Sequence, residues 1–276
     1  MKLVIGPASP ILGKRIAEKC GLEIAETVYK KFPDGELYAR VIGRDERFVV
    51  VQSLNSNEDL VYLMLIFDAI SDSDIIAVIP YMGYARQDKA FLDGEAVSIR
   101  AVAKMIESYA DTVITVNIHS REAAGHFKNL IDLDAMRVIG DYYKGRDIVM
   151  ISPDLGSLER VKRAAEFAGC EFDYLEKKRI DAETVIVTPK KIDVSGRDVV
   201  IVDDIISTGG TVIEAAKQLS CRSIEAACVH AVLASNALNK LYNAGISKVI
   251  ATDTIEKAVS ILTVSDLISE EIKRLI

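Results

Sequence analysis

The chain has 276 residues, half of them hydrophobic, and a net charge of -7 from 34 lysines and arginines against 41 aspartates and glutamates. This length suits one large α/β domain or two smaller ones, and the acidic balance excludes a broad basic surface for nucleic acid. The four cysteines lack metal-binding spacing, no apolar run is long enough to span a membrane, and no secretory leader is present, which together predict a cytoplasmic protein.

Strand-like apolar runs alternate with segments of helical periodicity, the signature of βαβ units in a parallel sheet. The run KLVIG leads into a helix that ends at Gly21, a residue suited to a helix C-cap. The runs FVVVQS, IIAVIPYMG and VITVNIHS follow, with a helical segment after each of the first two. Because these runs are continuous rather than alternating, we expect strands that are buried on both faces.

The second half of the chain repeats the order of the first. Residues 3–21 resemble residues 148–169, YKKFPDGE parallels EKKRIDAE, and FVVVQS parallels VVIVDD, at a nearly constant offset. An offset kept over three elements indicates a duplication. Equivalent features should then lie on equivalent faces, at the carboxyl ends of the strands, where open α/β sheets bind ligands.

The duplication predicts two similar α/β domains, residues 1–140 and 141–276, with the boundary near GDYYKGRD at 140–147. We expect each to be a doubly wound parallel sheet. For the terminal helix SDLISEEIKRLI, packing against the first domain is one arrangement that the sequence leaves open.

The segment VVIVDDIISTGGT joins a strand at 199–202 to two acids, Asp203 and Asp204, and then to a loop that enters a helix. The loop consists of Ser207, Thr208, Gly209, Gly210 and Thr211. Glycines let the backbone approach a ligand, and amides and hydroxyls at a helix N-terminus accept phosphate. No lysine follows the glycines, so this is not a Walker A loop. Acids beside a phosphate loop suit a sugar phosphate, whose vicinal hydroxyls donate to carboxylates; the alternative is an ordinary βα turn with an acidic cap.

Two segments of the first half offer groups for a nucleotide. In FPDGE, the ring of Phe32 can stack on a base and the acids Asp34 and Glu36 can accept from an exocyclic amine, although a Pro-Asp-Gly sequence alone is a common turn. In YMGYARQDK, Arg86 and Gln87 stand just past a strand, within reach of phosphate or ribose, where a lone Arg-Gln pair would be ordinary surface.

Two more segments look structural when taken alone. His119 follows a strand in VNIHSREAAGHF, where a histidine can reach into a cleft, whereas His126 and His230 are expected to be structural. EKKRID at 176–181 reads as a solvated charge run followed by a hairpin over RIDAETVIVTPKKIDVSGRD.

The five motifs FPDGE, YARQD, the His119 segment, KKR and DD-STGGT, in this order, resemble the ribose-phosphate pyrophosphokinase family, which has the type I phosphoribosyltransferase fold. The resemblance spans nearly the whole chain. It implies that ATP and ribose 5-phosphate give 5-phosphoribosyl 1-diphosphate and AMP for nucleotide biosynthesis. One departure follows YARQD, where KAFLDGEAVS replaces the more basic stretch of bacterial relatives, so allosteric control by phosphate and ADP is not carried over.

The resemblance also implies residue roles. The residues for ATP are Phe32, Asp34, Gly35, Glu36, Arg86 and Gln87. Those for ribose 5-phosphate are Arg179, Asp203, Asp204, Ser207, Thr208, Gly209, Gly210 and Thr211. Lys177 and Arg179 would be catalytic on a movable flap, with Lys178 pointing elsewhere if the segment is extended. His119 and Asp154 would hold Mg²⁺, directly or through water, which suits an ion that takes few protein ligands.

A homodimer or higher homo-oligomer is implied as well, with FPDGE completing a neighbour's nucleotide pocket. Two alternatives stay open. A phosphoribosyltransferase would explain DD-STGGT but leaves FPDGE, YARQD and KKR without a role. A non-catalytic regulatory homologue predicts loss of the basic pair, the histidine or the acid pair, all of which are present.

Overall fold

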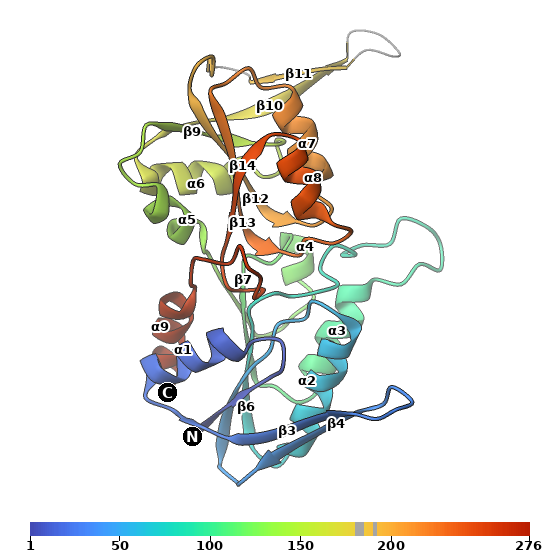
Figure 1. Cartoon of the computed structure of the whole chain (residues 1–276). Coiled ribbons are helices and arrows are strands. Elements are labelled where there is room, and N and C mark those ends of the chain that lie inside the picture. Colours follow the sequence, from blue (N-terminus) through green and yellow to red (C-terminus); the bar gives the residue numbers. More distant parts are fainter. Residues whose placement is uncertain (180–184, 190–191) are drawn as a thin grey trace. The chain divides into compact units, whose positions relative to one another are not determined.

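The computed structural model describes the backbone of residues 1–179, 185–189 and 192–276, and the side chains of 1–175 and 192–276. These residues form two compact units, and Figure 1 labels most of their helices and strands. The first unit comprises residues 1–134, 254–256 and 264–276, and the second comprises residues 135–253 and 257–263.

The first unit is built on a parallel sheet in the order β2-β1-β5-β6-β7-β8. Its strands are β1 (Lys2–Ile5), β2 (Glu23–Ile24), β5 (Arg47–Val51), β6 (Asp74–Ile79), β7 (Thr112–Val116) and β8 (Leu130–Leu133). A separate antiparallel hairpin pairs β3 (Glu26–Lys31) with β4 (Leu37–Ile42). The helices are α1 (Pro10–Cys20), α2 (Asn57–Ala69), α3 (Ser98–Ile106), α4 (Arg121–Ala124) and α9 (Ser265–Leu275).

The second unit has a sheet in the order β11-β10-β9-β12-β13-β14, parallel except for the β10–β11 pair. Its strands are β9 (Ile148–Ser152), β10 (Glu171–Arg179), β11 (Val185–Pro189), β12 (Asp198–Ile206), β13 (Ser223–Ala231) and β14 (Ile246–Ala251). The helices are α5 (Met136–Tyr143), α6 (Leu158–Ala168), α7 (Gly210–Lys217) and α8 (Ala237–Asn243).

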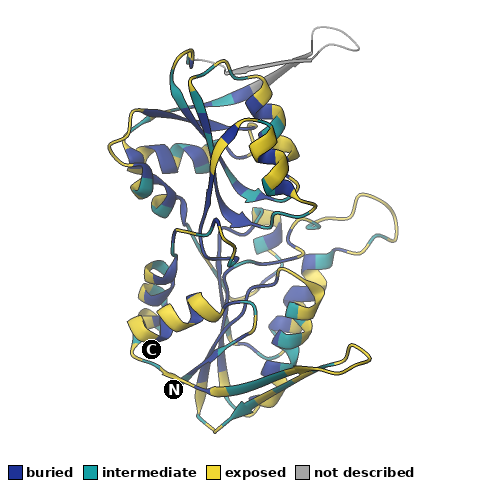
Figure 2. Cartoon of the chain, in the orientation of Figure 1, coloured by how far each residue is buried: buried dark blue, intermediate teal, exposed yellow. Residues whose placement is uncertain are grey.

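The predicted fold class is confirmed. Both sheets place their first strand beside the next long one, β1 beside β5 and β9 beside β12, and continue outward in chain order. The central strands are buried along their length, while the exposed residues lie on the outer faces of the helices and in the loops (Figure 2). The predicted C-cap at Gly21 after α1 is present, with the left-handed conformation, and Gly169 after α6 has the same conformation.

The units differ in how the hairpin joins the sheet. In the first, the strand is interrupted between β2 and β3, so the β3–β4 hairpin is a sheet of its own. In the second, β10 runs without interruption from the sheet into the hairpin with β11. The hairpin that carries the KKR segment is therefore a direct extension of the sheet edge.

The division between the units falls at Asp134, before α5, so the segment 140–147 lies inside the second unit. The terminal helix α9 belongs to the first unit and packs against α1, where Lys19 forms an ion pair with Asp266. Among the described helices, none has both the length and the apolar character needed to cross a bilayer.

Candidate active site

The acid pair lies within β12 and not just beyond it. The strand extends to Ile206, past the predicted end at 202, and α7 begins at Gly210. The reason is the neighbouring strand, because Asp203 and Ile205 stay in register with Cys228 and His230 of β13. Polar residues in a strand interrupt an apolar pattern, so its true end could not be seen in the sequence.

The loop after β12 presents backbone amides at the start of α7. Gly209 is the N-cap in a left-handed conformation with φ 78°, and a Cβ there would lie 3.2 Å from Leu241. Ser207 is fixed by its carbonyl, which accepts from the Ala234 amide at 3.0 Å. No side chain caps α7 among the described residues, so the amides of its first turn are oriented for an anionic ligand.

The first turn of α6 holds the acid pair. The Ser157 hydroxyl donates to Asp203 Oδ1 at 2.8 Å, and Arg160 lies 3.5 Å from Asp204 Oδ2. Burial, together with the adjacent Asp204 carboxylate, raises the pKa of Asp203 to about 7. Ser157 and Arg160 were not singled out in the sequence. Ser157 could have been found by comparing the two halves of the sequence, because Ser9 stands at the same place before the first helix of the other half.

Asp154 lies in the loop between β9 and α6 and is exposed. Its Oδ1 accepts from the Ser157 amide at 3.1 Å, and its backbone carbonyl accepts from the Ser152 hydroxyl at 2.6 Å. Ser157 therefore contacts Asp154 through its amide and Asp203 through its hydroxyl. The predicted metal ligand and the predicted ribose ligand lie at one corner of the second unit.

The FPDGE segment forms the tip of the β3–β4 hairpin in the first unit. The Phe32 amide donates to the Glu36 carbonyl at 2.7 Å, and the Asp34 carboxylate accepts from the Glu36 amide at 3.2 Å. The turn reading of the Pro-Asp-Gly sequence is thus correct for its backbone. The Phe32 ring is about half exposed, at 47%, and meets Tyr38 edge-on, with 6.4 Å between the ring centroids. The hairpin tip therefore presents an aromatic ring that is about half exposed.

The YARQD segment follows β6 in a turn. Tyr84 has a positive φ of 63° and its hydroxyl donates to Asn57 Oδ1 at 2.5 Å. Arg86 is exposed, whereas the Gln87 side-chain amide donates to the Lys89 carbonyl at 3.2 Å. Of the two nucleotide ligands predicted in this segment, Arg86 is exposed to solvent and Gln87 is hydrogen-bonded to its own loop.

His119 lies between β7 and α4, past the end of the strand as expected. Beside it, the Ser120 hydroxyl donates to Asp88, which belongs to the YARQD segment. The Ser120 hydrogen bond, together with the nearby Lys89 and His119, lowers the pKa of Asp88. The YARQD turn and the His119 loop are therefore joined within the first unit.

His126 and His230 fit the structural roles expected of them. Nε2 of His126 lies 2.9 Å from the Asp88 backbone carbonyl, and His230 is buried at 1% exposure.

Lys177 and Arg179 belong to β10, where they pair in register with Val187 and Val185 of β11. The predicted hairpin exists, but it was placed too late in the chain: the basic triplet lies in its first strand and not ahead of it. The side chains of both residues lie outside the described part of the structure. His119 and Asp154 belong to different units, so their pairing stays a prediction.

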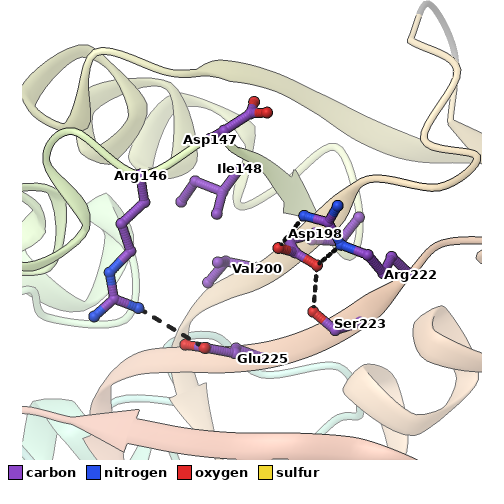
Figure 3. A pocket seen from close by; sticks show the side chains of 9 residues that line it. Arg146, Asp147, Ile148, Asp198, Val200, Arg222, Ser223 and Glu225 are labelled. Atoms are coloured by element: carbon purple, nitrogen blue, oxygen red, sulfur yellow. Dashed lines mark hydrogen bonds and ion pairs between the residues drawn. The ribbon is translucent and has the colours of Figure 1, made fainter.

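A pocket of about 210 Å³ opens at the other end of the second sheet (Figure 3). It lies where three strands begin, at Ile148, Asp198 and Ser223. Arg222 donates twice to the Asp198 carboxylate, at 2.8 and 2.5 Å. Parallel α/β sheets bind ligands at the opposite, carboxyl ends of their strands.

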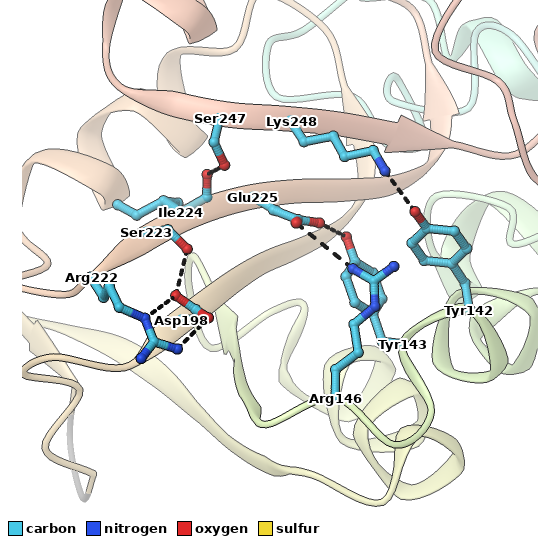
Figure 4. A network of polar contacts seen from close by, with 10 residues as sticks. All are labelled: Tyr142, Tyr143, Arg146, Asp198, Arg222, Ser223, Ile224, Glu225, Ser247 and Lys248. Atoms are coloured by element: carbon cyan, nitrogen blue, oxygen red, sulfur yellow. Dashed lines mark hydrogen bonds and ion pairs between the residues drawn. The ribbon is translucent and has the colours of Figure 1, made fainter.

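The charged side chains around this pocket form ion pairs and hydrogen bonds with one another (Figure 4). The Tyr143 hydroxyl donates to Glu225 at 2.9 Å, and Arg146 lies 3.8 Å from the same carboxylate. The Arg146 guanidinium also lies 4.7 Å from the centre of the Tyr142 ring. Burial and the Glu225 charge raise the pKa of Tyr143. The network stabilises the amino ends of the strands and is not the candidate site.

An acid pair followed by a Ser/Thr/Gly loop, at the carboxyl end of a strand in a doubly wound sheet, defines a protein of the phosphoribosyltransferase type. Two family models match the chain. The phosphoribosyl transferase domain matches residues 124–261, and the N-terminal domain of ribose phosphate pyrophosphokinase matches residues 1–109.

Relatives that match along the whole chain show which family of phosphoribosyltransferase-type proteins it belongs to. The chain is 61% identical to ribose-phosphate pyrophosphokinase 2 of Archaeoglobus fulgidus, over 99% of this chain and 100% of the relative. It is 42% identical to the ribose-phosphate pyrophosphokinase of Methanosarcina acetivorans, with both chains covered completely. The crystal structure of phosphoribosylpyrophosphate synthetase from Mycobacterium smegmatis superposes with a TM-score of 0.85 and 26% identity, over 99% of this chain and 98% of that one. The chain belongs to the ribose-phosphate pyrophosphokinase family.

Proposed function

We propose that the protein transfers the diphosphoryl group of ATP to the C1 hydroxyl of ribose 5-phosphate, giving 5-phosphoribosyl 1-diphosphate and AMP. The observation that carries this proposal is the corner of the second unit where Asp203 and Asp204 lie beside the α7 N-terminus. The names of the relatives support it, and the product would feed nucleotide biosynthesis.

Ribose 5-phosphate would bind at this corner. The carboxylates of Asp203 and Asp204 would accept from the ribose hydroxyls, in place of part of their present contacts with α6. The 5-phosphate would lie at the start of α7, where the amides of the first turn and the Ser and Thr hydroxyls would donate to it. The phosphate ligands are Ser207, Thr208, Gly209, Gly210 and Thr211, with Arg179 as a further contact.

ATP would bind through residues of the first unit, so that residues 1–140 form the nucleotide side and residues 141–276 the acceptor side. The half-exposed Phe32 ring would stack on the adenine, and the acids Asp34 and Glu36 would accept from its amino group, with Gly35 completing the turn. Arg86, exposed after β6, would contact the phosphates, with Gln87 beside it.

The chemistry forms a bond from the C1 oxygen to the β-phosphorus and breaks the bridge between the α- and β-phosphates. The hydroxyl proton passes to solvent and AMP leaves. Such transfers depend on positioning and on neutralising the charge of the transferred group. Lys177 and Arg179 would supply that positive charge from β10, which explains why an acidic protein can act on two polyanions.

Mg²⁺ fits the donor set of the candidate site. Asp154 is an exposed carboxylate whose Oδ1 is held by the Ser157 amide, and His119 follows a strand end in the other unit. The Asp154 carboxylate is a hard oxygen donor of the kind this ion prefers, and His119 could contact the ion through one of the several waters that the ion keeps. No three His, Cys, Asp or Glu side chains converge on a metal position among the described residues. The proposed ligands are His119 and Asp154, as the family resemblance implies. The bound ion would neutralise phosphate charge.

The protein acts in the cytoplasm on small molecules. It works as a homodimer or a higher homo-oligomer, in which the exposed FPDGE tip of one protomer contributes to a neighbour's nucleotide pocket.

One assay tests the proposed reaction. The protein is incubated with Mg²⁺, ATP and ribose 5-phosphate, and AMP and 5-phosphoribosyl 1-diphosphate are quantified together. We expect equal amounts of both, and no AMP when ribose 5-phosphate is omitted or Mg²⁺ is removed by a chelator. Absence of AMP with all components present would rule the reaction out, and base-dependent release of diphosphate would indicate a phosphoribosyltransferase.

A further inference from the structure

Strand β10 changes its partner halfway along. Residues 171–174 pair in parallel with β9, whereas residues from Leu175 to Arg179 pair antiparallel with β11 (Figure 1). The two predicted catalytic residues, Lys177 and Arg179, thus stand on the half of the strand that pairs with β11 and not with β9. Their position depends on how the hairpin is fixed at its base.

Asp173 lies next to this change of partner and is almost fully buried, at 3% exposure. Its Oδ1 accepts from the Tyr174 amide at 2.9 Å, and its Oδ2 accepts from the Ile192 amide at 3.0 Å. Tyr174 belongs to the strand that enters the hairpin, and Ile192 follows the strand that leaves it. One carboxylate therefore joins both sides of the hairpin base.

The surroundings make this contact strong. Leu175 and Val194 are buried at 3% and 4% exposure in the core of the second unit, and Ile192 packs against the same core. Hydrogen bonds to a charged acceptor in such a dry place are stronger than those at a surface. A carboxylate is also required by the geometry. The side chain of asparagine has one acceptor oxygen, so its amino group would face a backbone amide that also donates.

We propose that Asp173 is a positioning residue for the diphosphoryl transfer, because its carboxylate fixes the base of the β10–β11 hairpin from which Lys177 and Arg179 act. This inference rests on the proposed function. Since Lys177 stands two residues past Leu175, a shift at the base moves the basic side chains relative to the reacting phosphates. Misplacement by about 1 Å is enough to slow a reaction about 100-fold.

The test compares Asp173→Asn with a matched control, Asp193→Asn, in the full-length chain. Asp193 lies in the same segment and also accepts from a backbone amide, that of Ser195 at 2.9 Å, but it is exposed. For Asp173→Asn we expect kcat to fall about 10- to 100-fold. The KM for ATP should stay within about twofold, because the residues proposed to bind ATP belong to the first unit. Asp193→Asn should match the wild type.

Hydrogen exchange tests the contact separately from catalysis. In the wild type the Ile192 amide should exchange slowly, and in Asp173→Asn this amide and those of β10 and β11 should exchange faster. Fast exchange at Ile192 in the wild type would overturn the contact without any variant. Faster exchange in Asp173→Asn with an unchanged kcat would overturn the positioning role. A wild type that makes no AMP would refute the proposed function instead, so the two failures are distinguishable.

Discussion

The hydroxyl of Ser157 donates to the carboxylate of Asp203 at 2.8 Å, while the amide of the same serine donates to Asp154 at 3.1 Å. One residue at the start of α6 therefore orients both the candidate ribose ligand and the candidate metal ligand. Arg160, one turn further along α6, lies 3.5 Å from Asp204. The start of α6 therefore fixes the side chains of the proposed ribose 5-phosphate site, although α6 contributes none of the residues predicted to bind that substrate.

Replacing Ser157 by alanine should weaken the use of ribose 5-phosphate. The variant removes a donor to a carboxylate, and such a bond is worth about 1.5–3 kcal/mol, so kcat/KM for ribose 5-phosphate should fall about 10- to 100-fold. The KM for ATP should not change. Steady-state kinetics with each substrate varied in turn measures both. Ser247→Ala is the control, because its hydroxyl also bonds within this sheet, to the Ile224 carbonyl at 2.8 Å, but at the start of β14.

The Asp203 carboxyl should make stability depend on pH. Its pKa in the folded protein is about 7, above the unfolded value near 3.9, so the folded state holds a proton that the unfolded state has lost. Its contribution is full below about pH 4 and is lost as the pH rises toward 7. Asp203→Asn, which stays neutral, should therefore gain in Tm relative to the wild type between pH 5 and pH 7.5. An equal difference in Tm at both values would contradict the raised pKa.

The basic residues of β10 should affect kcat and the KM for ATP differently. Lys177→Ala and Arg179→Ala should each lower kcat about 100-fold or more, because each removes a charge that stabilises the transferred group, with little change in the KM for ATP. Lys178→Ala is the matched control, since alternate residues of an extended strand face opposite sides. Loss of ATP affinity with kcat intact would show that these residues bind the nucleotide and do not act in the transfer step.

Much of this architecture was readable from periodicity, because buried strands and glycine-capped helices leave local patterns. The two-sheet fold was predicted in this way, and so was a hairpin near residue 180, although it was placed after the basic triplet that its first strand in fact contains. The end of β12 was not, because Asp203 and Ile205 are held in the strand by β13, a contact that no local pattern shows. Arg160 and Asp173 were missed for the same reason. Their partners, Asp204 and Ile192, come from elsewhere in the chain, and a charged residue alone looks like surface.

The duplicated corner of the first unit differs from the second in its chemistry. Ser53 stands two residues after Val51, the last residue of β5 that pairs with β1. Asp203 has the equivalent place in β12, two residues after Ile201, the last residue that pairs with β9. Its amide donates to the Ser9 hydroxyl at 3.0 Å, and its own hydroxyl donates to the Thr254 carbonyl at 2.5 Å. With a serine in place of the acid and chain segment 254–256 beside it, this corner lacks the carboxylate that is proposed to hold the ribose in the second unit.

Glu256 completes that corner, and its removal should affect stability but not catalysis. Its Oε1 accepts from the Ile11 and Leu12 amides, both at 2.8 Å, at the start of α1, whose first turn has no acidic residue of its own. A negative charge at a helix N-terminus is worth about 0.3–1 kcal/mol, so Glu256→Gln should lower Tm by about 1–4 °C, with kcat unchanged. Calorimetry measures the shift, and Glu270→Gln, exposed on α9, is the control. A Tm equal to that of the wild type would mean that the charge adds nothing to this contact.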